Sequence, residues 1–170
     1  TTDGVKDFGY GQPYYMLNTD TLLNGKRRGA YGVWSPDSRY FATVVTDERQ
    51  VKDLWVINAL AEPRPTLETY KYQMPGEREA PVEHLYVFDM SNNTRKEIKT
   101  ERFKDQTLSI GRKPREQKQR HMYDQPAIWL GDANHFYVTR SSRDLHRIDI
   151  CSYTIGDDEL KPVIEERLNT

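Results

Sequence analysis

The chain has 170 residues, with 25 Lys and Arg against 26 Asp and Glu and a formal net charge of −1 at pH 7. This balance excludes a strongly basic nucleic-acid-binding protein and an acidic tail protein, and a mean hydropathy of −0.88 is too low for the run of about 18 apolar residues that a membrane span requires. The 3 Trp, 11 Tyr and 5 Phe supply large side chains for a core, so the composition predicts a folded, β-rich domain and not a disordered chain.

Segments of high β-propensity recur along the first half of the chain, separated by turn residues. Tyr31–Trp34 and Tyr40–Thr46 flank the turn Ser35-Pro36-Asp37-Ser38, and this arrangement predicts a β-hairpin. Further strands are predicted at Asp53–Asn58, His84–Met90 and Arg95–Ile98, the last two joined by the turn Ser91-Asn92-Asn93.

The stretch 66–74 allows two interpretations. Leu67, Tyr70 and Met74 would share one face of a helix. The flanking Pro65 and Pro75 and the aromatic content favour a strand instead.

In the second half, the stretch Gly111–His121 has no periodicity and carries five Lys or Arg residues, so it is predicted to be a solvated loop. No segment has a convincing amphipathic helical pattern, and the chain is predicted to be all-β. Strands are expected at Ala127–Trp129, His135–Thr139, Ile148–Tyr153 and Leu160–Ile164, with turns at Gly131–Asn134 and Gly156–Asp158.

Two sections of the sequence look alike. Val33–Thr43 reads strand, Trp, polar turn with Asp, strand, and Ile128–Val138 repeats this order 95 positions later. The hairpin Leu85–Ile98 is echoed by the hairpin Arg147–Ile164. Repetition at multiples of roughly 40–50 residues is typical of β-propeller blades.

A propeller blade buries its faces against neighbouring blades, so the Trp before each turn is expected to pack between blades. The chain would hold about three to three and a half four-stranded blades, fewer than the four to eight of a closed propeller. Two blade faces would then stay open, and the chain is expected to self-associate. The expected boundaries are 1–30 (a partial blade), 31–83, 84–126 and 127–170.

The residues also resemble a known family. Trp34-Ser35-Pro36-Asp37-Ser38 followed by Tyr40-Phe41-Ala42 is similar to the blade motif of the propeller domain in dipeptidyl peptidase IV-like serine peptidases, and the motif also occurs in TolB-type propellers. A longer run, similar to the middle blades of bacterial members, makes the resemblance more specific. That run comprises Thr46–Arg49, Asp53–Asn58, Pro63–Gly76, Ala80–Val82, Leu85–Asp89, Ile150-Cys151 and Pro162–Arg167.

The resemblance implies an eight-bladed propeller that caps a C-terminal α/β-hydrolase domain, whose Ser, Asp and His do the chemistry. Gly-x-Ser-x-Gly does not occur in this sequence, so no catalytic residue is expected here and the hydrolase domain is expected outside the chain. Because the sequence starts at Thr1 without an initiating Met, the chain is expected to be an internal fragment of a longer protein. Its role would be to exclude large folded proteins from the active site and to help hold peptide substrates.

Dipeptidyl members of the family bind the substrate's amino terminus with two adjacent glutamates that precede the Trp-Ser-Pro motif. The corresponding stretch here, Gly9–Gly32, has Asp20 as its one acidic residue. Dipeptidyl specificity is therefore not implied, and no substrate-binding residue is assigned.

Other candidate residues favour ordinary structural roles. The adjacent Glu165 and Glu166 are expected to be surface carboxylates on opposite strand faces, and Asp47-Glu48-Arg49 to form an ion pair at a loop rim, with a substrate role as the alternative. His84, His121, His135 and His146 lack metal-ligand spacing, so no metal or other cofactor is expected. The basic loop 112–120 lacks interleaved aromatic residues, which disfavours nucleic-acid binding.

Cys151 is the one cysteine, which excludes a disulfide within the chain. Its strand-like context favours a buried structural thiol, and a partner cysteine outside the chain is left open.

Two functions remain after these observations. The first is a catalytically inert propeller portion of a periplasmic or secreted dipeptidyl peptidase IV-like serine exopeptidase, whose partners are the hydrolase domain and peptides. The second is a non-enzymatic TolB-like propeller that acts as a protein-interaction platform.

Overall fold

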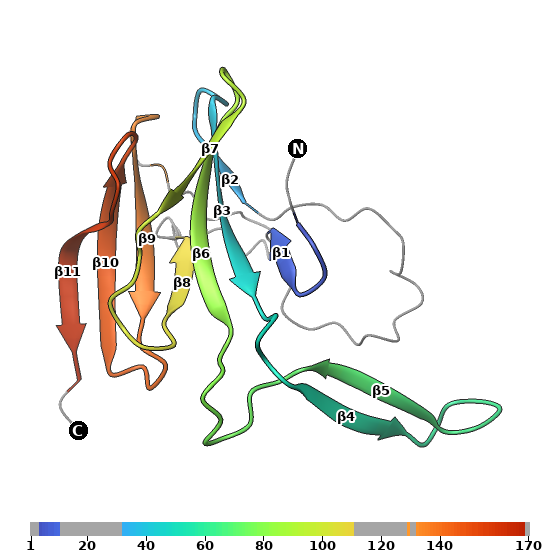
Figure 1. The fold of residues 1–170 in the computed structure, drawn as a ribbon. Coiled ribbons are helices and arrows are strands. Elements are labelled where there is room, and N and C mark those ends of the chain that lie inside the picture. Colours follow the sequence, from blue (N-terminus) through green and yellow to red (C-terminus); the bar gives the residue numbers. More distant parts are fainter. Residues whose placement is uncertain (1–3, 11–31, 111–128, 130–131, 169–170) are drawn as a thin grey trace, which may run out of the picture.

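A computed structural model describes residues 4–10, 32–110, 129 and 132–168. Within these residues the secondary structure is entirely strands, turns and bends (Figure 1). The described residues contain no helix of the length and apolarity needed to cross a membrane. The strands form two main sheets and one separate hairpin, all with antiparallel pairing.

The first sheet has β3 and β6 at its centre. These two long strands pair residue for residue from Tyr40↔Asp89 to Asp47↔Val82. β7 pairs with the other edge of β6, and two short strands, β1 and β2, pair with the other edge of β3. The strand bounds are β1 Phe8–Tyr10, β2 Val33–Trp34, β3 Tyr40–Asp47, β6 Val82–Asp89 and β7 Thr94–Ile98.

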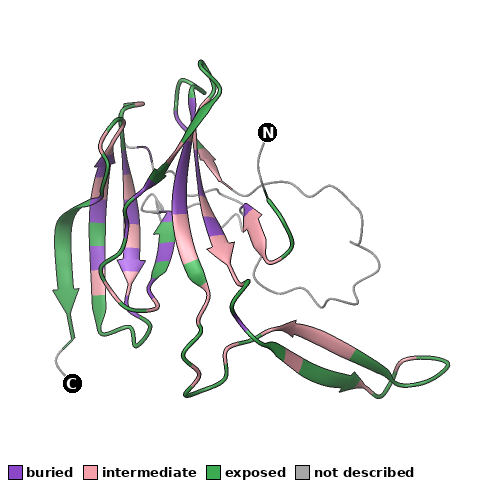
Figure 2. Ribbon diagram, in the orientation of Figure 1, coloured by how far each residue is buried: buried purple, intermediate pink, exposed green. Residues whose placement is uncertain are grey.

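The second sheet is a four-stranded meander of order β11-β10-β9-β8. A β-bulge at Ile150/Cys151 shifts the register between β10 and β11. β11 is exposed along its whole length, as the green outer strand in Figure 2 shows. The strand bounds are β8 Thr107–Ile110, β9 His135–Ser141, β10 Arg147–Thr154 and β11 Lys161–Arg167.

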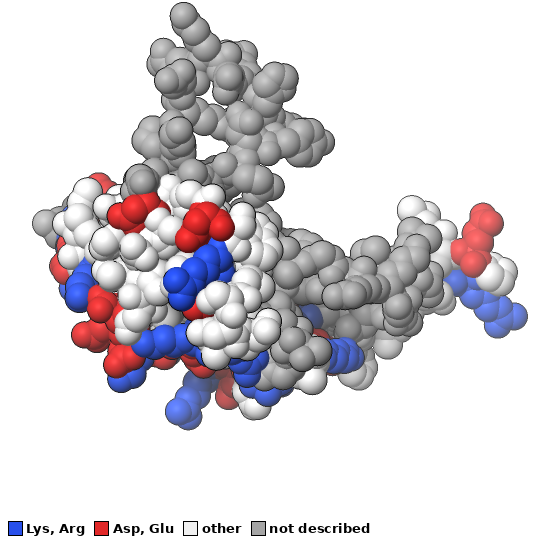
Figure 3. All heavy atoms as spheres, turned by 90° about the horizontal axis from the view of Figure 1, so that it is seen from above, with Lys and Arg blue, Asp and Glu red and all other residues white. Residues whose placement is uncertain are grey.

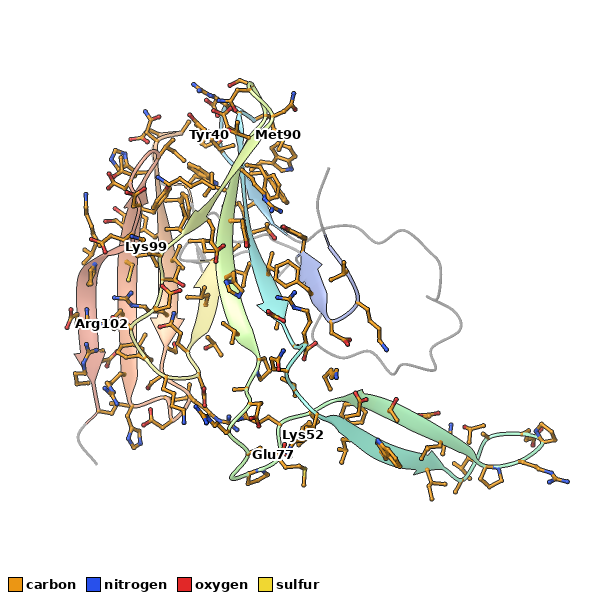
Figure 4. The ribbon with its side chains drawn as sticks, viewed as in Figure 1. Tyr40, Lys52, Glu77, Met90, Lys99 and Arg102 are labelled. Atoms are coloured by element: carbon orange, nitrogen blue, oxygen red, sulfur yellow. The ribbon has the colours of Figure 1, made fainter. Side chains whose placement is uncertain are left out.

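The third unit is the hairpin formed by β4 (Asp53–Asn58) and β5 (Thr66–Lys71), which extends away from both sheets (Figure 1). Its base is fixed by Lys71, whose Nζ donates to the carbonyl of Val51 at 2.8 Å, and by the Lys52–Glu77 ion pair at 3.5 Å (Figure 4). The structure thus selects the strand interpretation for this stretch, with the strand ending at Lys71.

The main core lies between the two sheets. Buried side chains of β3, β6 and β7 face buried side chains of β8, β9 and β10, in the purple regions of Figure 2. Alternation along β9, where every second residue is buried, places Phe136, Val138 and Arg140 on this inner face. The antiparallel pattern of one buried face per strand therefore positions the second sheet against the first.

In both sheets one edge is a composite strand, formed by two short segments that pair with different parts of the same long strand. β1 pairs with the end of β3 and β2 with its beginning. In the same way β8 pairs with the end of β9, and Trp129 forms a bridge to Phe136 near its beginning. The predicted repeat is therefore present in the pairing as well as in the sequence.

The turns of the repeat are held by hydrogen bonds to aspartates. Asp37 Oδ1 accepts hydrogen bonds from the Arg39 N–H at 3.1 Å and from the Ser35 hydroxyl at 2.6 Å. Asp132 Oδ1 accepts from the backbone N–H groups of Asn134 and His135 at 2.6 and 2.9 Å. These bonds hold the pKa values of both carboxyls below the ordinary range.

The expected blade boundary between residues 83 and 84 does not coincide with a sheet boundary. It falls inside β6, which pairs along its whole length with β3. The strand pattern at 53–71 was assigned to the body of a blade, but these strands pair with each other as a separate hairpin. The described residues contain two sheets of blade size and one separate hairpin.

Candidate functional site

The most concentrated group of charged side chains surrounds Asp149, on the inner face of the second sheet. Its carboxylate is fully buried and accepts hydrogen bonds from Arg140 Nε and Arg167 Nη1, both at 2.9 Å. Arg102 Nε lies 3.3 Å from Asp149 Oδ2. Burial alone would raise the pKa of Asp149, but the three guanidinium groups hold it below its ordinary value.

Phe103 lies at the centre of the arginines of this group. The guanidinium carbons of Arg102, Arg140, Arg147 and Arg167 lie between 5.4 and 5.9 Å from the centre of its ring. Cations at this distance are attracted to the negative face of an aromatic ring. The segment 99–106, which connects the two sheets, is thereby attached to the second sheet (Figure 4).

Further contacts hold the same connection. Arg140 Nη1 donates to the carbonyl of Thr100 at 3.1 Å, and Arg102 Nη2 lies 2.9 Å from Glu165 Oε1. Gln106 stabilises the conformation of this segment, since its Oε1 accepts hydrogen bonds from the backbone N–H groups of Arg102 and Phe103. The charged group therefore acts as a structural joint between sheets.

Glu83 forms a second polar link between the sheets. Its side chain is half-buried, and its Oε2 accepts a hydrogen bond from the backbone N–H of Leu108. Burial raises the pKa of Glu83 above its ordinary value, although the bond from Leu108 opposes this. The pair joins β6 of the first sheet to β8 of the second.

The predicted rim ion pair at Asp47-Glu48-Arg49 is present. Arg49 donates to both carboxylate oxygens of Asp47, at 2.9 and 2.7 Å, and lowers the pKa of Asp47. Its guanidinium also lies 4.7 Å from the centre of the Phe8 ring. Glu48 differs from Asp47: burial, and next the nearby Asp7, raise its pKa. Because Asp47 is already paired, it is a poor ligand for a substrate ammonium group.

His84 belongs to a small hydrogen-bonded group of polar side chains on the face of the first sheet that points away from the second sheet. Its Nδ1 lies 2.7 Å from Glu97 Oε1, and the Tyr86 hydroxyl donates to Glu97 Oε2 at 2.8 Å. His135 lies near Asp132, with its Nδ1 3.0 Å from Oδ2. Among the described residues, no three His, Cys, Asp or Glu side chains gather in a way that would hold a metal ion.

Cys151 is buried in the core between the sheets, as predicted for a structural thiol. Burial raises the pKa of its thiol, so the nucleophilic thiolate is disfavoured. Glu165 and Glu166 are exposed and lie opposite Asp149 and Ile148 in the register, on alternate faces of β11. Glu165 is paired with Arg102 and Arg167 and is not presented to a ligand.

Three of the predicted features lie outside the described residues. They are His121, the basic loop 112–120, and most of the stretch 9–32 in which the glutamate pair was sought. Figure 3 shows Lys and Arg interspersed with Asp and Glu on one described face, in keeping with the near-neutral charge.

The Asp149 group and Glu83 were not anticipated from the sequence. The signal available was a single acid in an apolar strand run, Ile148-Asp149-Ile150-Cys151, since a charge at a buried strand position requires a partner. Its partners Arg102, Arg140 and Arg167 lie 9 to 47 positions away, so the sequence pattern does not identify them.

Comparison with known proteins gives the chain a family. Residues 1–170 match the model of the dipeptidyl peptidase IV N-terminal region. No curated protein matches the sequence. Among solved structures, Porphyromonas gingivalis dipeptidyl peptidase 4 is similar over 99% of this chain, with 16% identity and a TM-score of 0.71.

A Bacteroides ovatus structure assigned as a dipeptidyl aminopeptidase IV is similar over 82% of this chain, with 16% identity and a TM-score of 0.61. The chain spans 21% and 17% of these two structures, respectively. At this identity the likeness concerns the fold, and it confirms an all-β propeller fragment. The match to the family model extends over the whole chain, and the chain therefore belongs to the family of dipeptidyl peptidase IV N-terminal regions.

Proposed function

We propose that the chain is the non-catalytic propeller portion of a dipeptidyl peptidase IV-like serine exopeptidase. The family match over residues 1–170 carries this proposal. The described residues support it, because their charged groups form structural ion pairs between strands and the thiol of Cys151 is buried, which raises its pKa.

In this proposal the chain shapes peptide access to a C-terminal α/β-hydrolase domain in the same periplasmic or secreted protein. A rigid wall suits this role because access control requires fixed positions. The joint at Asp149 and the Glu83 link to Leu108 both fix one sheet against the next. The partners are then the hydrolase domain and peptide substrates, with no cofactor.

The test compares the isolated chain with the longer protein that contains it. The isolated chain is expected to give no turnover of X-Pro chromogenic substrates above the blank, and the longer protein is expected to give enzyme-like turnover. A fluorophosphonate probe should label the longer protein at a serine outside residues 1–170, mapped by peptide mass spectrometry.

Turnover by the isolated chain, or a probe-labelled serine within residues 1–170, would contradict the assignment. A folded longer protein with neither turnover nor probe labelling would support the non-enzymatic interaction platform instead.

A further inference from the structure

Arg147 differs in its pairing from the other three arginines around Phe103. Each of those three contacts Asp149 within 3.3 Å, and two of them also contact Glu165 at 2.9 Å. Arg147 forms no ion pair with any residue that the structure describes, although its guanidinium carbon lies 5.4 Å from the centre of the Phe103 ring. Within the described residues, its charge is therefore not neutralised by direct contact with a carboxylate.

The neighbour of Arg147 across the sheet is a second arginine. Arg147 of β10 lies opposite Arg167 of β11 in the register. The N–H of Leu168 donates to the carbonyl of His146 at 2.9 Å, so the 147–167 pair occupies the next position, which is not hydrogen-bonded and at which opposite side chains lie closer. Like charges directly opposite each other destabilise a sheet. An anion shared by Arg147 and Arg167 would remove this repulsion.

The acidic residue nearest to Arg147 in the sequence before it, Asp144, has other partners. Its Oδ1 accepts hydrogen bonds from the Ser142 hydroxyl and from the backbone N–H of His146. The bond from Ser142 is the main cause of the lowered pKa of Asp144, and the charge of Arg147 is a smaller one. Asp144 therefore does not take the place of an ion-pair partner.

Three of the four arginines can be reached by a ligand. The side chain of Arg140 is only 5% exposed, whereas those of Arg102 and Arg167 are 35% and 34% exposed. Arg147 is exposed at the beginning of β10. Arg102 reaches both β10 and β11 through its contacts with Asp149 and Glu165 (Figure 4). Accessible guanidinium groups from two strands and the connecting segment thus surround one aromatic ring.

We propose that Arg147, with Arg167 or Arg102 beside it, binds a tetrahedral oxyanion of the phosphate or sulfate class. A guanidinium group presents parallel N–H donors that match two oxygens of such an anion. Because a tetrahedral anion directs its oxygens to several sides, it can contact a second arginine at the same time. The four guanidinium groups around Phe103 exceed the two carboxylates paired with them, and a bound anion offsets this excess.

Thermal unfolding of the chain tests the proposal, with chloride replaced stepwise by phosphate at pH 7 and constant ionic strength. The melting temperature of the wild type is expected to rise in a manner described by a single binding constant, as it does for a ligand that binds the folded state. Phosphate also stabilises proteins in general, because it is excluded from their surface. The variants below separate this general effect from binding.

Arg147→Gln is the test variant, and Arg64→Gln is the matched control. Arg64 is exposed in the loop of the β4–β5 hairpin, so its substitution removes the same charge elsewhere. Isothermal titration calorimetry is expected to show phosphate binding weakened about tenfold or more by Arg147→Gln and unchanged by Arg64→Gln. Arg147→Lys, which keeps the charge but not the parallel donors, is expected to give an intermediate affinity.

In chloride alone, Arg147→Gln is expected to melt close to the wild type. Loss of the contact with Phe103 is then offset by relief of the repulsion from Arg167. The advantage of the wild type is expected to appear as phosphate is added. An advantage of the same size in chloride and in phosphate would overturn the proposal, because Arg147 would then only pack on the ring.

Equal phosphate affinity of the wild type and Arg147→Gln would also overturn the proposal, since the general effect of the salt would then explain the stabilisation. Acetate at the same ionic strength is expected to bind at least about tenfold more weakly than phosphate. Equal binding of acetate would contradict the assignment to a tetrahedral anion. None of these measurements depends on turnover, so their failure would leave the proposed peptidase function untouched.

Discussion

At the scale of single residues, Asp149 has the most demanding position. Its carboxylate is fully buried, and Arg140 beside it is 5% exposed. Charges removed from water are tolerated when they are paired and hydrogen-bonded. Arg102, Arg140 and Arg167 supply that pairing, and the ring of Phe103 lies against the same guanidinium groups.

Substitution Asp149→Asn is expected to destabilise the chain by about 3–5 kcal/mol, because it leaves buried Arg140 without a counter-charge. The measurement is urea denaturation followed by circular dichroism. Glu166→Gln is the matched control, since Glu166 is exposed and lies one position from Glu165 on the same strand. The control is expected to change stability by less than about 0.5 kcal/mol.

The pH dependence of this effect follows from the lowered pKa of Asp149. A carboxyl whose folded pKa is depressed contributes stability above its unfolded pKa, about 3.9, and loses it as the pH falls through the folded pKa. The difference between wild type and Asp149→Asn is therefore constant between pH 5 and 8 and shrinks below about pH 4. A difference that grows on acidification would contradict this account of the joint.

At the scale of elements, the β4–β5 hairpin is separate from the two sheets. Asp53 and Lys71 are register partners at its base, and their side chains form an ion pair at 3.3 Å. Beyond this base, Trp55 and Ile57 are each 69% exposed and Leu67 is 53% exposed. Such side chains contribute little to the stability of the body, because they remain in water.

Replacement of residues 54–70 by an Asn-Gly turn is therefore expected to leave both sheets intact. Asp53 and Lys71, which flank the replaced residues, already lie opposite each other, so a two-residue turn can join them. The melting temperature is expected to stay within about 2 °C of wild type, a shift that corresponds to at most about 1 kcal/mol in a domain of this size.

Phe136→Ala, in the core between the sheets, is the comparison variant for this truncation. It is expected to cost about 3–5 kcal/mol. Loss of cooperative unfolding on truncation would show that the hairpin is part of the body.

The hairpin also shows where sequence reasoning succeeded and where it failed. Strand propensity identified Asp53–Asn58, and Pro65 and Pro75 correctly favoured a strand at 66–71. Propensity does not say which strand is the partner, however. β3 pairs with β6, and the paired residues lie 35 to 49 positions apart in sequence. The strands between them in the chain, β4 and β5, are therefore predicted in the same sheet as β3, because propensity carries no information on such distant pairing.

At the scale of the whole molecule, the all-β fold and the repeat were predictable because both depend on local patterns. A Trp followed by an Asp turn and an aromatic strand occurs twice, and both copies fold alike. The joint at Asp149 was not predictable, since it depends on arginines from a connecting segment and two different strands.

The isolated chain is expected to self-associate, because it exposes large apolar side chains on the hairpin and around Trp34. Sedimentation velocity over a range of concentrations measures this, and the average mass should rise with concentration. The hairpin truncation described above should reduce the effect. A monomer at every concentration that also fails to bind a hydrophobic dye would contradict the expectation.

The composite edge strands have a consequence for how such a protein changes over evolution. Tyr10 and Val33 pair with Val45 and Ala42 on one edge of β3, so the connection between them leaves and rejoins the sheet only three register positions apart. In the same manner, Ile110 pairs with Val138 of β9, and Trp129 pairs with Phe136 of the same strand. Since closure of a longer connection costs little free energy, insertions and deletions at these two places can change the length of a connection while the strands keep their positions.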